Sequence, residues 1–405
     1  MATFEATRSI PLPAASSAFQ PGRTLAGYLL VPRPKDLVKA VIVPLTFALG
    51  AVAQGGVGAT QLWRAALVWL VLELLVYQAR YQWNDVRGFA ADQAHPDRVA
   101  RGRLPGPIER RGLHVGASLA IAGLRLSLAL AVVLAVPEVR TVLAATTTAV
   151  FGVALVYEWV RSLATGRTTE MPVPLRPALV GLWVAVGAGY AVRGLTGLAL
   201  AVDLGGRGSL VVAAIVAMWA LGVVFVTCRW ALEASCFASF HGGAVVWDAA
   251  RAEAREHTLG LVRWLPRHLD SRALPAAGRP DNWRALQGCT ALTSPWHVAL
   301  VVAAAAAGVS GRLLVGGIAA GTAIAVLVVS GALALAVTRL SRRRCEAALL
   351  AAMALSVAQW LAGLDRPLVA ALPWLVVMVA YACFTHQCPG EIGRPLRRLE
   401  PLLRR

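Results

Sequence analysis

The sequence predicts an all-α protein, a polytopic bundle of nine or ten transmembrane helices around a central cavity open to the cytoplasmic side. Hydrophobic residues make up 58% of the 405 residues and charged residues only 15%. Soluble domains average about 45–50% apolar and about 25% charged residues. The apolar excess lies in blocks, most of which reach the roughly 20 residues with which a helix crosses a bilayer. These features indicate membrane spans rather than a large soluble core.

Ten apolar segments define the expected spans, and because the seventh is the shortest, nine spans is the alternative. The segments are 36–54, 61–84, 112–135, 140–160, 177–201, 209–233, 295–309, 313–338, 345–363 and 368–386. Residues 1–25 are mixed and polar and contain three prolines. They therefore lack the continuous apolar region of a secretory signal peptide.

The basic residues predict the orientation of the chain. With the N-terminus inside, 29 of the 39 lysines and arginines fall in cytoplasmic segments and five fall outside, as the positive-inside rule requires. We therefore expect an integral, multi-pass protein of the plasma membrane with both termini in the cytoplasm. Its parts are a cytoplasmic segment (1–35), one transmembrane helical domain (36–386) and a basic cytoplasmic tail (387–405). The cytoplasmic loops are 85–111, 161–176 and 234–294.

Charge and cysteine usage exclude two classes of site. The net charge of +18 comes from basic residues segregated by membrane side, so the expected partner is the lipid bilayer and not nucleic acid. The six cysteines show no paired spacing suited to zinc. Within the third loop, Ala249–His268 combines charged residues with Leu259, Leu261 and Trp264. This pattern predicts an amphipathic helix at the membrane interface with its apolar side toward lipid.

The most polar stretch of the chain, residues 73–105, follows the second span. A charged group at mid-bilayer costs about 2.5–3.5 kcal/mol, so such groups usually face a protein cavity. Asn84, Asp85 and Asp92 offer the oxygen ligands that Mg²⁺ prefers. Three nearby arginines supply planar forks that match phosphate oxygens: Arg87, Arg101 and Arg103. The alternative interpretation is that the acids end a span and the arginines only anchor it.

Asn84 and Asp85 followed by Asp92 resemble the first aspartate-rich motif of the UbiA superfamily of intramembrane prenyltransferases, N-D-x-x-D-x-x-x-D. The resemblance is closest to the decaprenyl-phosphate phosphoribosyltransferase branch, whose motif continues to H-P as His95 and Pro96 do here. Further motifs of that branch are similar to residues 33–39, 189–197 and 255–259. The resemblance runs in order over about residues 31–265, and the last spans match only in hydropathy.

The chain departs from the family pattern at three places. Gly88 stands where the motif has its middle aspartate, which removes a potential metal ligand. The family's Y-x-x-x-K appears as Tyr157 and Arg161, with arginine for lysine. The second aspartate-rich motif has no clean counterpart, and Glu233 is a better substitute for it than Asp248 or Glu253.

The resemblance implies a Mg²⁺ cofactor and assigns roles to residues that match the motifs. The implied metal ligands are Asn84, Asp85, Asp92 and Glu233. The implied phosphate-binding residues are Lys39, Arg87, Arg101, Arg103, Arg193 and Arg229. The implied catalytic residues are Asp85, Asp92, Tyr157 and Arg161, with Tyr157 orienting the leaving group or the carbocation.

Some of these residues have structural alternatives. Arg193 lies among apolar neighbours and can pair with Glu73 or Glu158 instead of a phosphate. Arg229 and Glu233 are four residues apart, the spacing of a local salt bridge on one helix. The tryptophans fit either an interfacial belt or the aromatic walls of a terpenoid pocket.

The resemblance implies Mg²⁺-dependent transfer of a prenyl group from an isoprenoid diphosphate to a lipophilic acceptor. Two other reactions fit the same scaffold: transfer of phosphoribose to a polyprenyl phosphate, and terpene cyclisation. Outside the enzymes, the chain fits a membrane homologue that lost catalysis as its motif decayed, with Gly88 as a trace of that decay. Metal-dependent binding of a diphosphate separates this last class from the others.

Overall fold

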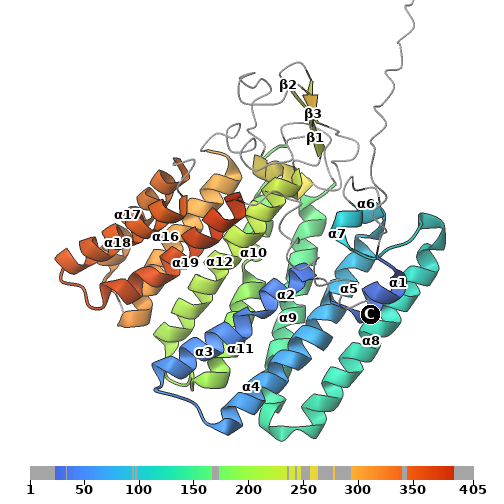
Figure 1. The fold of residues 1–405 in the computed structure, drawn as a ribbon, viewed down its shortest axis with the longest axis horizontal. Helices are drawn as coiled ribbons and strands as arrows, with labels where there is room; N and C mark the ends of the chain where they lie inside the picture. The colour runs from blue at the N-terminus through green and yellow to red at the C-terminus, as the bar shows by residue number, and fades with distance from the viewer. Residues whose placement is uncertain are drawn as a thin grey trace, which may run out of the picture.

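The structure is a computed structural model that describes residues 23–32, 34–93, 95, 98–166, 173–234, 237–241, 244–247, 256–262, 277–278, 293–316, 318–339 and 344–386. It is a helical bundle (Figure 1) in which seven helices are long and apolar enough to cross a membrane. The seven run over Ala59–Arg87, Ile108–Ala135, Pro137–Ala164, Pro177–Ala201, Gly208–Ala234, Pro295–Val315 and Ala320–Arg339. Val38–Ala53 and Pro367–Cys383 are shorter apolar helices. The membrane-embedded helical fold is confirmed, whereas the expected nine or ten spans are not.

The N-terminal half begins with three short helices, α1 (Leu25–Leu30), α2 (Pro34–Ala40) and α3 (Ile42–Ala53). The first long helix follows as α4 (Ala59–Val71), a π-helical turn η1 (Leu72–Val76) and α5 (Tyr77–Arg87). After it come α6 (Phe89–Gln93), α7 (Arg98–Arg101) and the 3₁₀ turn η2 (Ile108–Arg110). The next helices are α8 (Arg111–Ala135), α9 (Pro137–Ala164), α10 (Pro177–Ala185), α11 (Ala188–Ala201) and α12 (Gly208–Ala234).

The C-terminal bundle consists of α16 (Pro295–Val315), α17 (Ala320–Arg339), α18 (Arg344–Leu361) and α19 (Pro367–His386). The expected break between residues 309 and 313 is wrong, because α16 continues to Val315. It ends where Gly316 adopts a φ of 150°, which favours glycine. Arg312, expected outside the membrane in a loop, is buried in the last turn of α16, and its Nη1 donates to the Asp365 carbonyl at 2.6 Å. This bond gives the buried guanidinium a carbonyl partner, although hydropathy alone would place the charge in a loop.

Close packing of small residues joins the helices. A Cβ at Gly197 of α11 would lie 2.1 Å from Thr46 Oγ1 of α3, and a Cβ at Gly311 of α16 would lie 1.8 Å from the Ala370 carbonyl of α19. Such contacts are typical of membrane helices, where close backbone approach replaces the hydrophobic driving force. The buried residues form two main clusters, one around α3, α4, α9 and α11 and one around α12, α16 and α19.

The described parts of the three loops that were expected on one side lie at one end of the bundle (Figure 1). Loop 234–294 contains a short antiparallel sheet, β1 (Ala238–His241) between β2 (Ala244–Trp247) and β3 (Ala277–Gly278). It also contains the short helix α14 (Glu256–Leu259) and the 3₁₀ turn η5 (Gly260–Val262). Residues 1–22 and the tail 387–405 lie outside the described residues.

The expected interfacial helix over Ala249–His268 is wrong for its described part, residues 256–262. This segment is buried inside the bundle, against α12 and α16. Glu256 forms an ion pair with Arg176, and His257 Nδ1 lies 3.2 Å from Thr165 Oγ1. Because the polar side chains of this segment have partners on the loop 161–176, the segment can be buried in the bundle and need not lie at the membrane surface.

Candidate functional site

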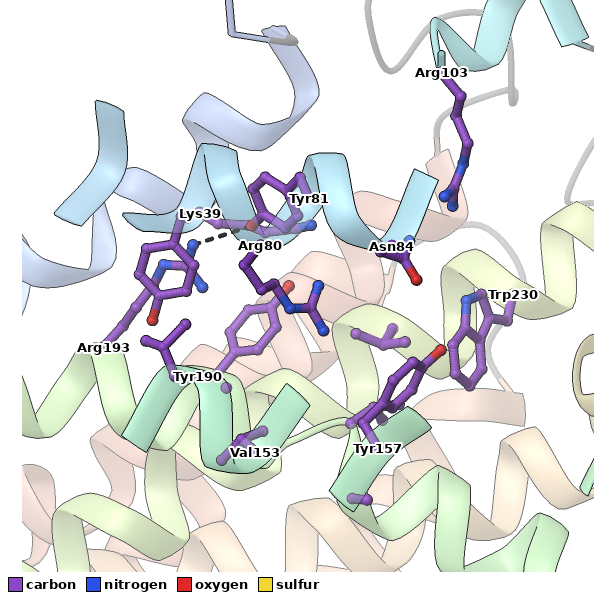
Figure 2. A pocket seen from close by; sticks show the side chains of 16 residues that line it. Lys39, Arg80, Tyr81, Asn84, Arg103, Val153, Tyr157, Tyr190, Arg193 and Trp230 are labelled. Carbon is purple, nitrogen blue, oxygen red and sulfur yellow. Dashed lines mark hydrogen bonds between the residues drawn. The ribbon is translucent and has the colours of Figure 1, made fainter. Parts of the chain in front are cut away.

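A cavity of about 190 Å³ lies within the N-terminal half of the bundle (Figure 2). Its walls come from α2, α5, α9, α10, α11 and α12. The lining residues are Lys39, Tyr77, Arg80, Tyr81, Asn84, Arg103, Val150, Val153, Tyr157, Ala185, Val186, Gly189, Tyr190, Arg193, Val226 and Trp230. Four of them are cationic and none is acidic. The described wall is therefore basic and aromatic, which suits an anionic ligand with an apolar part.

The face of α5 explains how the cavity acquires its polar groups. Tyr77, Arg80, Tyr81 and Asn84 are spaced three and four residues apart, so they project from one side of the helix. Figure 2 shows the Arg80 side chain extending from α5 into the middle of the cavity, with Lys39 and Arg193 on one side and Asn84 and Arg103 on the other.

Asp85 and Asp92 lie close together, as expected, and Arg103 bridges them. Arg103 Nη1 lies 2.8 Å from Asp85 Oδ1, and its Nε lies 3.5 Å from Asp92 Oδ2. Both carboxylates are buried, with exposed fractions of 1% and 3%. The Tyr28 hydroxyl also donates to Asp85 at 3.3 Å. Arg103 thus stands between the cavity, which it lines, and the two acids behind it.

The ion pairs continue away from the cavity through Arg101. Its Nη2 lies 3.4 Å from Asp92 Oδ1, and its Nη1 lies 2.8 Å from Glu233 Oε1. His95 Nε2 lies 3.7 Å from the same Glu233 oxygen. Glu233 therefore lies in the same ionic cluster as Asp92. The local Arg229–Glu233 salt bridge is not formed, and Arg229 has no ion pair with any described residue.

Asn84 joins this cluster to α9. With its amide nitrogen facing Glu158, Asn84 donates to Glu158 Oε1 at 3.1 Å and its oxygen accepts from Arg103 Nη1 at 2.9 Å. Glu158 is buried and pairs with Arg161 at 3.0 Å and with Arg87 at 3.4 Å. Arg161 and Arg87 thus hold a carboxylate behind Asn84 and do not line the cavity.

Arg193 finds its partner in Glu73, one of the two acids considered for it. The guanidinium donates to Glu73 from Nε at 2.9 Å and from Nη2 at 3.3 Å, and Nη2 also donates to the Tyr81 hydroxyl at 3.0 Å. The ring of Tyr77 covers the Arg193 guanidinium at 3.3 Å. The pair is buried, so Arg193 has a structural role at the cavity wall.

The remaining wall is aromatic. Tyr157 lies 6.5 Å from Trp230 between ring centroids, and Trp230 meets the edge of His257 at 4.7 Å. Lys39 pairs with Asp36 at 3.3 Å and lies 5.2 Å from the Tyr81 ring centroid. Trp230 belongs to the cavity, whereas Trp63 and Trp159 are exposed on the outer surface.

The donor chemistry of Asn84, Asp85 and Asp92 fits Mg²⁺, which commonly takes one or two carboxylates and completes its shell with water and phosphate oxygens. Among the described residues, no group of three or more His, Cys, Asp or Glu side chains is placed to hold a metal ion. In this arrangement the arginines Arg101 and Arg103 balance the charge of the aspartates. A metal at these carboxylates would require at least Arg103 to move.

Gly88 lies beside the carboxylates. It follows α5 with a φ of −87°, and a Cβ at this position would lie 3.3 Å from Asp92 Oδ2. The position therefore tolerates a side chain by backbone conformation. A carboxylate introduced here would face Asp92, as the family motif implies.

The sequence assigned no role to Arg80, Tyr81 or Tyr190, which line the cavity. Arg80 precedes Asn84 by four residues, so its helical spacing places it on the Asn84 face. Tyr190 comes from α11, and its position next to α5 depends on tertiary packing. Comparison of the chain with protein-family models, curated proteins and solved structures found no match.

Proposed function

We propose that the chain is a Mg²⁺-dependent membrane transferase of the UbiA type that moves a prenyl group from an isoprenoid diphosphate to a lipophilic acceptor. The observation that carries this proposal is the basic, aromatic cavity whose wall includes Asn84 and Arg103, with Asp85 and Asp92 directly behind Arg103. Asn84, Asp85 and Asp92 also resemble the first aspartate-rich motif of the family, with Gly88 in place of its middle aspartate.

The chemistry of the cavity suits the reacting parts of such a substrate. Arg103 presents its guanidinium to the cavity, where it can bind phosphate oxygens. Tyr157 and Trp230 present ring faces, which stabilise the positive charge that develops on an allylic carbon as diphosphate leaves. The valines of α9 and α12 provide apolar surface for a hydrocarbon chain. The surrounding helices would limit the access of water to the cation.

Asp85, Asp92 and Asn84 would hold the metal. When bound, Mg²⁺ neutralises charge on the diphosphate leaving group. Arg103 would exchange its carboxylate partners for phosphate oxygens, since the same guanidinium reaches both aspartates and the cavity. Tyr157 would orient the donor chain from the opposite wall.

The test is product analysis on membranes that contain the protein, supplied with labelled geranyl, farnesyl or geranylgeranyl diphosphate, or with phosphoribosyl diphosphate. A prenylated lipid formed only with Mg²⁺ supports the proposal. Labelled phosphoribosyl lipid, or a cyclic hydrocarbon formed without an acceptor, would replace it with one of the alternative reactions. No product from any donor, together with no Mg²⁺-dependent diphosphate binding, would overturn the catalytic interpretation.

Isosteric variants connect this activity to the site. Asp92→Asn removes the carboxylate charge while it retains the side-chain size, and turnover should fall by at least about 100-fold if Asp92 holds the metal. Asp203→Asn is the matched control, because Asp203 is exposed beside a turn and, among the described residues, accepts a hydrogen bond only from the Gly205 amide. Thermal melting of each variant is needed, since Asp92 also pairs with Arg101 and Arg103.

A further inference from the structure

Arg80 differs from the other three cations of the cavity in having no acidic partner among the described residues. Lys39 pairs with Asp36, Arg193 with Glu73, and Arg103 with the two aspartates. Arg80 forms no ion pair or hydrogen bond with any described residue. Its guanidinium carbon instead lies 5.6 Å from the ring centroid of Tyr81 and 5.9 Å from that of Tyr157.

Two hydroxyl groups of the same cavity also lack partners in the part of the chain that the structure describes. Tyr77 and Tyr190 are 3% and 5% exposed, both line the cavity, and neither hydroxyl has a hydrogen-bond partner among the described residues. A buried hydroxyl without a partner costs free energy. A ligand oxygen that accepts a hydrogen bond would satisfy it.

An arginine inside a membrane-embedded helix is normally paired or exposed to a water-filled cavity. Arg80 is half-buried on α5, four residues and one helical turn before Asn84. It therefore lies away from the carboxylates of Asp85 and Asp92. The apolar side chains of Val150, Val153 and Val226 line the same cavity.

We propose that Arg80 and the Tyr190 hydroxyl form an anion-binding subsite for the phosphate or carboxylate headgroup of an amphiphilic ligand. Arg80 supplies the charge, Tyr190 donates a hydrogen bond, and the valines contact the ligand's hydrocarbon. Because none of these groups is a carboxylate, the subsite binds its ligand without metal. It uses none of the carboxylates of the Mg²⁺-diphosphate site proposed above, although the two sites share the valine wall of one cavity.

The test is calorimetric titration of the detergent-purified full chain in EDTA with three probes: inorganic phosphate, hexyl phosphate and hexanoate. We expect hexyl phosphate and hexanoate to bind, and hexyl phosphate to bind several-fold more tightly than inorganic phosphate. Arg80→Gln should weaken binding of hexyl phosphate by about 10- to 100-fold, the effect of losing a charge-assisted hydrogen bond. Tyr190→Phe should weaken it by about 2- to 10-fold, the effect of losing a neutral hydrogen bond. Arg207→Gln, an exposed arginine at a turn, is the matched control and should bind as the native protein does.

Each alternative result has a defined meaning. Arg80→Lys retains the charge and should recover most of the affinity, which separates charge loss from altered packing. If a folded Arg80→Gln protein binds hexyl phosphate as tightly as the native protein does, the proposed subsite is wrong. If the native protein binds inorganic phosphate and hexyl phosphate equally tightly, the proposal that the ligand is amphiphilic is wrong. If the metal-free binding persists in Asp92→Asn while Mg²⁺-dependent pyrophosphate binding is absent from the native protein, this inference stands and the transferase proposal fails.

Discussion

The buried pair of Arg193 and Glu73 permits a quantitative test of what holds the cavity wall. The perturbation is Arg193→Met, which retains an unbranched side chain and removes the charge. It leaves the Glu73 carboxylate buried, with a side-chain exposure of only 6%, and removes two hydrogen bonds to it, at 2.9 and 3.3 Å. Breaking a buried ion pair by removing one partner costs about 3–5 kcal/mol. We expect the free energy of unfolding to fall by about that amount.

The assay is denaturant unfolding of the purified protein in detergent, for each single variant and for Glu73→Leu combined with Arg193→Met. The double variant should recover most of the lost stability, since replacing both members of a buried pair by apolar residues is close to neutral. Arg80→Met is the control, because Arg80 has no acidic partner among the described residues and its loss breaks no ion pair. The reasoning would be refuted if the double variant were as unstable as Arg193→Met alone.

Three further predictions concern helix contacts, the metal site and orientation. Gly197→Ala should lower the free energy of unfolding by about 1–3 kcal/mol or more, because the added Cβ would lie 2.1 Å from Thr46 Oγ1. Gly123→Ala is the control and should be tolerated, because its Cβ would have no described atom within 4 Å. Thermal melting compares the two variants. Gly88→Asp should lower the Mg²⁺ concentration for half-maximal turnover, since the added carboxylate faces Asp92; an unchanged requirement in a folded variant would contradict the metal assignment. In a cysteine-free background, Ser209→Cys should react with an impermeant thiol reagent in intact cells and Glu109→Cys should not. Labelling of Glu109→Cys would contradict the expected orientation, in which the loop 85–111 is cytoplasmic.

Much of the helical fold could be predicted because hydropathy is a local property. Each of the ten apolar segments contains helix, and the loop 85–111 brings Asp85, Asp92 and Arg103 together as their short sequence separation suggested. Charge segregation also predicted correctly that the three polar loops share one end of the bundle. These features depend on neighbouring residues, so one sequence carries enough information for them.

The remaining features depend on partners that are distant in the chain. Glu73 and Arg193 are 120 residues apart, and Thr165 and His257 are 92 apart. The amphipathic pattern around Leu259 indicated a membrane surface, because its polar partner Arg176 lies in another loop. Arg312 suggested a loop for the same reason, since its carbonyl partner belongs to Asp365. A hydropathy scale scores each charged residue as if it had no partner. In the folded bundle, packing brings a distant residue close enough to be that partner.

The π-helical turn Leu72–Val76 makes chain length itself a determinant of the site. It interrupts a continuous helix from Ala59 to Arg87, and successive residues of an α-helix are about 100° apart around its axis. One extra residue in a regular α-helix would rotate everything after it by about that angle, whereas a π-helical turn accommodates the extra residue and leaves the two flanking α-helices nearly aligned. With the π-helical turn in place, Val68 faces the core while Arg80 faces the cavity. A single-residue deletion in the α-helical part of α4, with every side chain of the cavity retained, would turn the polar face of α5 away from the cavity relative to α4, whereas a single-residue deletion in the π-helical turn would not.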